Sequence, residues 1–150
     1  MQVYTHIVNN QKWDLRMLEL AKHVSNWSKD PSTKVGAVIA DGKYIVSLGY
    51  NGLPEGIGNE EKILNDRELK YETIIHGEIN AIATASRSVR GCTLYTYPFL
   101  PCSRCASQII QHGINRVVSY VNYEDRWRKS IMLSEELFSE CNIEVVQYES

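Results

Sequence analysis

Several kinds of sequence feature are absent from this chain of 150 residues. No apolar run approaches the roughly 20 residues that a membrane-spanning helix needs. Residues 1–14 have neither the basic flank nor the apolar stretch of a secretory signal. Neither sign of charge is in large excess, since the chain has 16 Lys and Arg and 18 Asp and Glu. Non-specific binding of nucleic acid normally needs an excess of basic residues. We therefore expect a cytoplasmic protein with no membrane or polynucleotide partner.

Cysteine is scarce, with four residues, and nothing else in the sequence indicates the oxidising compartment in which disulfides form. Cys102 and Cys105 form a Cys-x-x-Cys pair. Cys92 and Cys141 stand alone, and we interpret them as small core residues because free cysteine is among the most buried residue types. Repeats, low-complexity tracts and flexible linkers are absent too. The chain is thus expected to fold as one domain over residues 1–150.

The hydrophobic pattern predicts an α/β domain. Helical spacing of apolar residues predicts helices over residues 10–28, 76–87, 102–112 and 125–140, and short apolar runs between turn signals predict strands over residues 35–40, 44–50, 92–97, 116–121 and 143–148. Ile79, Ile82 and Ala83 are expected to face inward. The charged residues 59–72 are expected to form a solvated loop or a short helix. This order of elements predicts a mixed sheet of five strands layered between helices.

A His-Gly-Glu segment that begins at His76 and a Pro-Cys-x-x-Cys segment that ends at Cys105 carry the most chemical information. Both lie at expected helix N-termini, and Cys102 and Cys105 share one helix face. The positive end of a helix favours thiolates. If the two helices are neighbours, one imidazole and two thiolates can converge on Zn²⁺ and leave a position for water, as in catalytic zinc sites. Glu78 is then the candidate proton carrier.

Two other interpretations of these motifs stay open. A non-catalytic zinc-binding regulatory protein would use the same metal ligands, but a purely structural site normally takes four protein ligands and would not require Glu78. A thiol oxidoreductase would use the Cys102–Cys105 pair alone. That interpretation predicts loss of activity on alkylation and indifference to chelators.

Longer segments make the chain resemble the deoxycytidylate (dCMP) deaminase branch of the zinc-dependent cytidine deaminase-like family. The His-x-Glu and Pro-Cys-x-x-Cys motifs together are the zinc deaminase signature. Further matching segments are SKDPSTKVGA at residues 28–37, GYNGLPEG at 49–56, GCTLY at 91–95 and IIQHGI at 109–114. The resemblance covers roughly residues 13–121 and implies a three-layer α/β/α fold. It departs at Gly77, where the family usually has alanine.

The resemblance implies hydrolysis of dCMP to dUMP and ammonia, a reaction that feeds thymidylate synthesis. Zn²⁺ would be bound by His76, Cys102 and Cys105, and Glu78 would carry a proton from water to N3 of the ring. Other implied substrate contacts are the Gly77 N–H to the pyrimidine O2, the Leu100 carbonyl to the amine, and Asn51 to the sugar hydroxyl. Candidate phosphate contacts are Lys29, Ser32 and Lys34, and Tyr120 is expected to line the pocket.

The resemblance further implies a homohexamer regulated by dCTP and dTTP through the glycine loop, where Gly52 and Gly56 are the candidate effector contacts. A nucleoside triphosphate effector could bring Mg²⁺. Deamination of dCTP remains an alternative, as does another deaminase reaction of the fold, on tRNA adenosine or guanine. The segment after Asn122 resembles no fixed family pattern.

Overall fold

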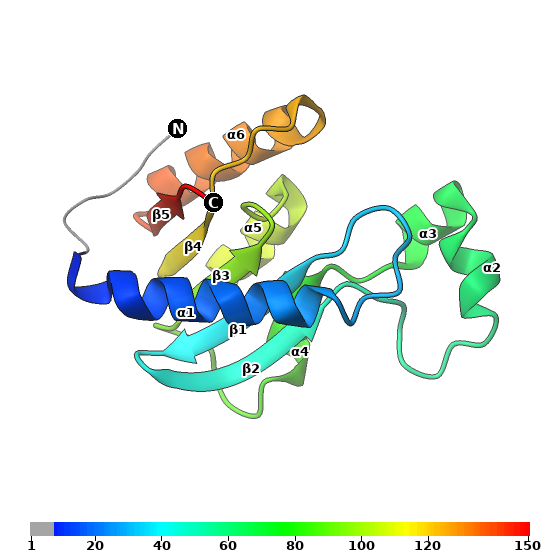
Figure 1. Cartoon of the computed structure of the whole chain (residues 1–150), viewed down its shortest axis with the longest axis horizontal. Coiled ribbons are helices and arrows are strands. Elements are labelled where there is room, and N and C mark those ends of the chain that lie inside the picture. Colours follow the sequence, from blue (N-terminus) through cyan, green and yellow to red (C-terminus); the bar gives the residue numbers. More distant parts are fainter. Residues whose placement is uncertain (1–7) are drawn as a thin grey trace.

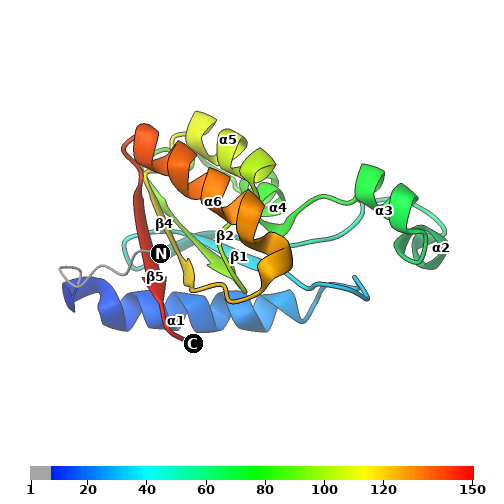
Figure 2. The same cartoon turned by 90° about the horizontal axis from the view of Figure 1, so that it is seen from above.

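The computed structural model describes the backbone of residues 8–150 and the side chains of residues 11–150. A five-stranded sheet separates one long helix from three helices on the opposite face (Figure 1), and Figure 2 shows the three layers in profile. The elements are α1 (Val8–Ser25), β1 (Gly36–Asp41), β2 (Tyr44–Tyr50), α2 (Glu60–Leu64), α3 (Arg67–Thr73), α4 (Gly77–Thr84), β3 (Thr93–Tyr97), α5 (Ser103–Gln111), β4 (Arg116–Tyr120), α6 (Asp125–Glu140) and β5 (Glu144–Tyr148). Within the described residues, no helix is both long and apolar enough to cross a membrane.

The sheet is mixed, as the sequence predicts. Its strand order is β2-β1-β3-β4-β5, with β1 antiparallel to both of its neighbours and β3, β4 and β5 parallel to one another. Helices α5 and α6 connect the parallel strands across the same face of the sheet (Figure 2). Side chains that follow β3 and β4 are therefore brought to one edge, where parallel α/β sheets commonly bind ligands.

Helix α1 covers one face of the sheet alone. Met17, Leu18 and Ala21 pack there against Val38 and Val118 in a buried apolar cluster. The helical stripe predicted from the sequence is confirmed at Met17 and Ala21, but Trp27 is 49% exposed. The reason is that α1 ends at Ser25, and the chain turns before Trp27 can continue the buried stripe.

Helices α4, α5 and α6 cover the other face over a second cluster that includes Leu94, Ile109 and Phe138. Helix α4 lies directly on β2 at Gly49, where a Cβ atom would stand 2.3 Å from the Ala81 nitrogen. This close approach buries Ala81 and turns Ala83 to solvent, so the expectation that Ala83 faces inward is wrong.

The predicted burial of the two isolated cysteines is only half right. Cys92 is buried at the start of β3, with 1% of its surface exposed. Cys141 is exposed, because it forms the C-cap of α6, one residue beyond the helix that carries the apolar stripe. Hydrophobic character alone therefore does not place a cysteine in the core.

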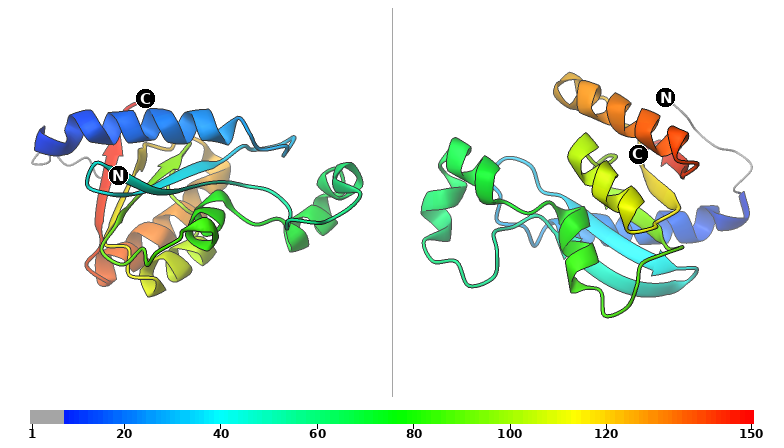
Figure 3. Two further views of the ribbon diagram at one scale, coloured as in Figure 1. Left: turned by 90° about the horizontal axis from the view of Figure 1, so that it is seen from below. Right: turned by 180° about the vertical axis from the view of Figure 1, so that it is seen from behind.

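Residues 53–74 leave the body of the molecule as an arm that carries α2 and α3 (Figures 1 and 3). The base of this arm is closed by an antiparallel bridge, in which the Gly52 and Ile75 N–H groups each donate to the other residue's carbonyl at 3.0 and 2.8 Å. The charged stretch thus forms two short helices, the second capped by Asp66, whose side chain accepts from the Leu69 N–H.

Candidate metal and catalytic site

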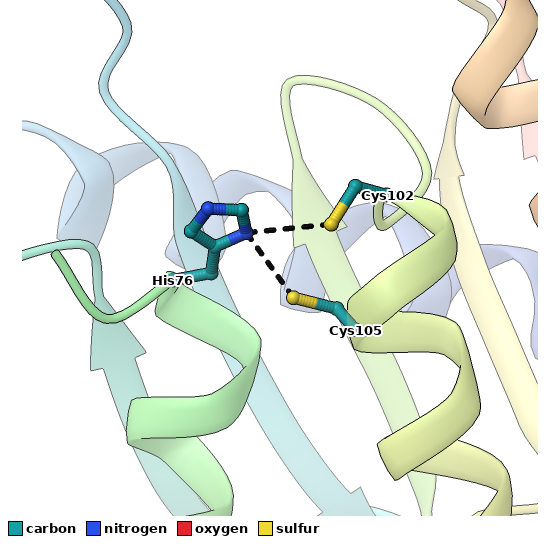
Figure 4. Close-up of side chains that lie close together, drawn as sticks. All are labelled: His76, Cys102 and Cys105. Carbon is teal, nitrogen blue, oxygen red and sulfur yellow. Dashed lines mark hydrogen bonds between the residues drawn. The ribbon is translucent and has the colours of Figure 1, made fainter. Parts of the chain in front are cut away.

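Three potential metal ligands converge between the first turns of α4 and α5. His76 and Cys102 are the N-cap residues of these helices and have extended backbones, so each side chain stands just before a first turn, and Cys105 lies within the first turn of α5. His76 Nδ1 lies 3.5 Å from Cys102 Sγ and 3.2 Å from Cys105 Sγ (Figure 4). The fold thus brings His76 to two cysteines that follow it by 26 and 29 residues in the sequence.

The spacing of these atoms suits a tetrahedral zinc ion. Zinc bonds of about 2.0–2.1 Å to nitrogen and about 2.3 Å to sulfur place tetrahedral ligand atoms about 3.6 Å apart. The three candidate ligand atoms lie within 4.8 Å of one another, and the two nitrogen-to-sulfur distances are close to the expected value. One imidazole and two thiolates leave the fourth position for water, as in catalytic sites.

The same three side chains share protons when no metal is present. A hydrogen bond from the Cys105 thiol, with a further one from His76, lowers the pKa of the Cys102 thiol well below its usual value. Donation to Cys102 and burial raise the pKa of Cys105, and the hydrogen bond to Cys102 raises the pKa of His76. A metal ion would replace these shared protons, since zinc requires deprotonated ligands.

Glu78 lies in the first turn of α4 and is only 4% exposed. Thr96 of β3 donates to its Oε2 atom at 3.3 Å, and within residues 11–150 its buried Oε1 atom has no hydrogen-bond partner. Burial raises the pKa of this carboxyl group, although the charge of His76 opposes the shift. A buried oxygen without a partner is costly, and this one lies two residues from the candidate ligand His76.

Helix α6 holds the segment that carries Cys102. The buried Ser134 hydroxyl donates to the Pro101 carbonyl at 2.7 Å, and the Ser103 N–H donates to the Ser130 hydroxyl at 3.1 Å. These bonds flank Cys102 on both sides. The sequence analysis missed both serines, because they lie beyond Asn122, where the chain resembles no fixed pattern, and a serine on a helix carries no signal of its own.

Gly77, between His76 and Glu78, packs against Tyr50 and Val35. A Cβ atom at this position would lie 3.3 Å from the Tyr50 Cα atom, from the Val35 carbonyl oxygen and from the Val35 Cγ1 atom. Real Cβ contacts are rarely this short, so alanine would require Val35 or the backbone to move by a few tenths of an ångström. The departure from the family's usual alanine therefore has a local packing reason.

Asn51, the expected sugar contact, holds the neighbouring loop. Its Oδ1 atom accepts from the Val35 N–H at 2.8 Å, and its Nδ2 group donates to the Thr33 carbonyl at 2.9 Å and to Asp30 at 3.2 Å. Both amide hydrogens are thus engaged, and only the second lone pair of Oδ1 is left for a sugar hydroxyl. The sugar contact stays a prediction, restricted to that acceptor.

The three predicted phosphate contacts lie on the loop at residues 28–35, whereas Tyr120, which was predicted to line the pocket, lies on the α1 face of the sheet. Lys29 forms an ion pair with Glu60 of the arm at 2.9 Å, and Ser32 and Lys34 are exposed on the loop that Asn51 holds. Tyr120 packs with the α1 face of the sheet and lies edge-on to Tyr97. Strand alternation explains this placement, because Tyr120 points the same way as Val118. The structure therefore does not bring Tyr120 to the metal ligands.

The remaining predicted contacts are backbone groups and glycines. Leu100 is 1% exposed and precedes the Pro101–Cys102 segment, and in the described part of the chain no hydrogen bond uses its carbonyl. Gly52 takes part in the bridge at the base of the arm, whereas Gly56 lies in the arm with a positive φ of 93°. Only glycine adopts such a φ without strain.

The chain is similar to a protein family and to curated proteins. Residues 11–121 match the family described as the cytidine and deoxycytidylate deaminase zinc-binding region. A protein of Aliivibrio fischeri, named "Uncharacterized deaminase in luxG 3'region", is 43% identical over 137 residues, which cover 89% of this chain and 92% of that protein. The deoxycytidylate deaminase of Pongo abelii is 37% identical over 114 residues, which cover 71% of this chain and 64% of that protein. The match thus spans less than two thirds of the mammalian relative.

A solved structure shares the fold. The dCMP deaminase of the cyanophage S-TIM5, crystallised in complex with dCMP and dUMP, aligns with a TM-score of 0.72 and 26% identity over 91% of this chain and 97% of that one. The expected cytidine deaminase-like fold, with three layers and a five-stranded mixed sheet, is therefore confirmed.

Proposed function

Because the chain belongs to the cytidine and deoxycytidylate deaminase family, we propose that it is a zinc-dependent enzyme that hydrolyses dCMP to dUMP and ammonia. One observation carries the proposal. His76, Cys102 and Cys105 converge with the spacing of three zinc ligands, and the unpartnered Oε1 atom of Glu78 belongs to the residue two positions after His76. A structural zinc site would need neither the open fourth position nor the buried carboxylate.

The donor set fits Zn²⁺, which when bound there would supply a water molecule of lowered pKa next to the substrate. Glu78 would take a proton from this water as the water oxygen bonds to C4, and would deliver that proton to N3 of the cytosine ring. Glu78 would then carry the remaining hydroxyl proton to the 4-amino group as the C4–N bond breaks, so that ammonia leaves and the C4 carbonyl forms. Thr96 holds one carboxylate oxygen and leaves Oε1 for this transfer. Burial, which raises the pKa of Glu78, suits a group that must both accept and release a proton.

The ring is oriented by backbone groups in this proposal. The unused Leu100 carbonyl accepts from the 4-amino group, and the Gly77 N–H donates to the pyrimidine O2. Leu100 lies two residues before Cys102 and Gly77 lies directly after His76, so both contacts are tied to the metal ligands. Asn51 accepts from the sugar hydroxyl through its second lone pair.

The choice of dCMP over other substrates is supported by the relatives named deoxycytidylate deaminase and by the phage enzyme crystallised with dCMP and dUMP. Deamination of dCTP, or another deaminase reaction of the fold on tRNA adenosine or guanine, stays an alternative. The thiol oxidoreductase interpretation is weakened by Glu78, because a dithiol couple leaves its buried Oε1 atom, which has no partner within residues 11–150, without a role.

Regulation and assembly are part of the same proposal. The arm, which contains Gly56 and has Gly52 at its base, is tied to the loop at residues 28–35 by the ion pairs Lys29–Glu60 and Lys70–Asp30. That loop contacts the start of α4, so an effector bound at the arm can act on the site. We propose dCTP and dTTP as effectors, the triphosphate with Mg²⁺, a homohexameric assembly and a cytoplasmic location.

The test measures deamination of free nucleotides and of one nucleoside, cytidine, by protein loaded with zinc. dCMP, dCTP, cytidine and dAMP are incubated separately, with and without a zinc chelator, and ultraviolet absorbance follows the loss of the amine. We expect turnover of dCMP that stops on chelation and returns on addition of zinc. Turnover of dCMP that persists in metal-free protein would overturn the proposal, and preferential turnover of dCTP would replace dCMP as the substrate.

A further inference from the structure

Positive charges around the loop at residues 28–35 differ in how they are compensated. Lys29 is paired with Glu60, and Lys70 is paired with Asp30 at 3.0 Å. Arg126, at the start of α6, reaches the same loop but donates from Nη2 to the neutral Thr33 hydroxyl at 3.0 Å. Among the side chains that the structure describes, no carboxylate pairs with Arg126. Its full charge is therefore available to an anionic ligand.

The guanidinium of Arg126 is also held in place. It lies over the ring of Trp127, 4.6 Å from the centroid, and the Trp127 ring packs against Phe99 at 5.6 Å. Phe99 directly precedes Leu100. The Thr33 hydroxyl and the Trp127 ring thus fix the cation from two sides, which lowers the entropy lost when it binds a ligand. Lys34, an exposed residue of the same loop, has no such support.

A chain of contacts connects Arg126 to the metal ligands. Thr33, which accepts from Arg126, also accepts through its carbonyl from Asn51 Nδ2, and Asn51 Oδ1 accepts from Val35. Val35 lies against Gly77, between His76 and Glu78. Thr33 and Val35 are two residues apart, which is at most about 7 Å of extended chain. Arg126 therefore lies at the Thr33 end of a short loop segment whose other end, Val35, lies against Gly77.

We propose that Arg126, supported by the Thr33 hydroxyl, binds the 5′-phosphate of the nucleotide and so selects nucleotides over nucleosides. This inference rests on the proposed function, because it assigns the phosphate of that substrate. A guanidinium presents paired N–H donors that match two phosphate oxygens, and such charge-assisted bonds are stronger than neutral ones. Arg126 lies outside residues 11–121, the segment that matches the family.

The decisive measurement compares dCMP with deoxycytidine in the Arg126→Gln variant of the zinc-loaded protein. We expect kcat/KM for dCMP to fall roughly 10- to 100-fold, the effect of one lost charge-assisted contact, with most of the change in KM. kcat/KM for deoxycytidine stays at the wild-type value. Inorganic phosphate should compete with dCMP in the wild type and should inhibit this variant more weakly. Arg126→Lys recovers part of the loss.

Arg128→Gln is the matched control, because it removes the same charge from the same helix two residues away, and it should leave both substrates unaffected. Activity on deoxycytidine shows that the Arg126→Gln protein is folded and holds zinc. An unchanged KM for dCMP in Arg126→Gln would overturn the inference, and so would a loss confined to Lys34→Gln. Failure of the wild type to deaminate dCMP at all would instead overturn the proposed function.

Discussion

Two buried carboxylates on opposite faces of one sheet have opposite surroundings. Asp14 of α1 is fully buried and accepts four hydrogen bonds, from the Tyr95 and Tyr148 hydroxyls at 3.0 and 2.7 Å and from two nitrogens of Arg116 at 2.8 and 2.7 Å. Glu78 of α4 is 4% exposed and accepts one, at 3.3 Å, with its other oxygen unpartnered. Similar burial thus accompanies complete and incomplete hydrogen bonding.

The difference in hydrogen bonding indicates that Asp14 stabilises the fold, whereas Glu78 is available for chemistry. Asp14 connects α1 to side chains of β3, β4 and β5 and keeps its charge neutralised by Arg116, so its position stabilises the three layers. Glu78 retains a costly free oxygen, which only a ligand or a proton can satisfy. Incomplete hydrogen bonding of a buried carboxylate beside candidate metal ligands thus fits the proton-carrying role that we propose for Glu78.

The largest expected effect concerns the unsatisfied carboxylate. Glu78→Gln should retain zinc but lose several orders of magnitude in kcat, since a positioned acid–base group contributes about 10²–10⁴-fold. Its thermal midpoint in the metal-free state should not fall, because the variant removes a buried charge that is only partly hydrogen-bonded. Turnover assays, metal analysis and calorimetry check this, and normal turnover would remove Glu78 from the mechanism.

The satisfied carboxylate should behave in the opposite way. Asp14→Asn leaves the Arg116 charge with less compensation, and breaking a buried ion pair costs about 3–5 kcal/mol of unfolding free energy. Denaturant unfolding measures this loss, while kcat per folded, zinc-loaded molecule should stay near the wild-type value. A large loss of kcat with unchanged stability would contradict the division between the two faces.

A smaller effect is expected from the support of Cys102. Ser130→Ala removes the acceptor for the Ser103 N–H, and loss of an outer contact to a metal ligand typically lowers metal affinity about 10- to 100-fold. Competition with a chromogenic chelator measures zinc affinity. Ser139→Ala, an exposed change on the same helix, serves as the control. Equal zinc affinity in the two variants would show that Ser130 only stabilises the fold.

The smallest effect concerns the rates at which the cysteine thiols are alkylated with and without zinc. Iodoacetamide should label exposed Cys141 in the zinc-loaded protein, and chelation should add Cys102, whose lowered pKa supplies thiolate at neutral pH. Cys92 should stay unlabelled, because burial raises the pKa of its thiol. Peptide mass spectrometry after brief labelling distinguishes the three positions. Labelling of Cys102 at equal rates with and without zinc would argue against its role as a ligand.

Much of the fold is local and could be predicted. The bounds of β2 and α6 agree with the predicted segments. Both were predicted from local signals, the Asp41-Gly42 turn before β2 and the apolar stripe from Trp127 to Phe138 along α6. Predictions that depended on neighbours were less secure. Ala83 faces solvent because Gly49 lets α4 lie close to β2, a contact between distant segments. Asp14 was also missed, although its spacing of three and four residues from Met17 and Leu18 places it on the buried side of α1.

The sequence by itself determined which residues form the candidate site, because the spacing of His76, Glu78, Cys102 and Cys105 is a chemical pattern that can be recognised without the structure. Tertiary packing alone decided that three of these side chains meet, that Glu78 keeps an oxygen without a partner, and that Arg126 reaches the loop beside them. The physical reason is distance along the chain. Helix and strand propensities act over a few residues, whereas hydrogen bonding and charge compensation depend on which remote segments the sheet brings into contact.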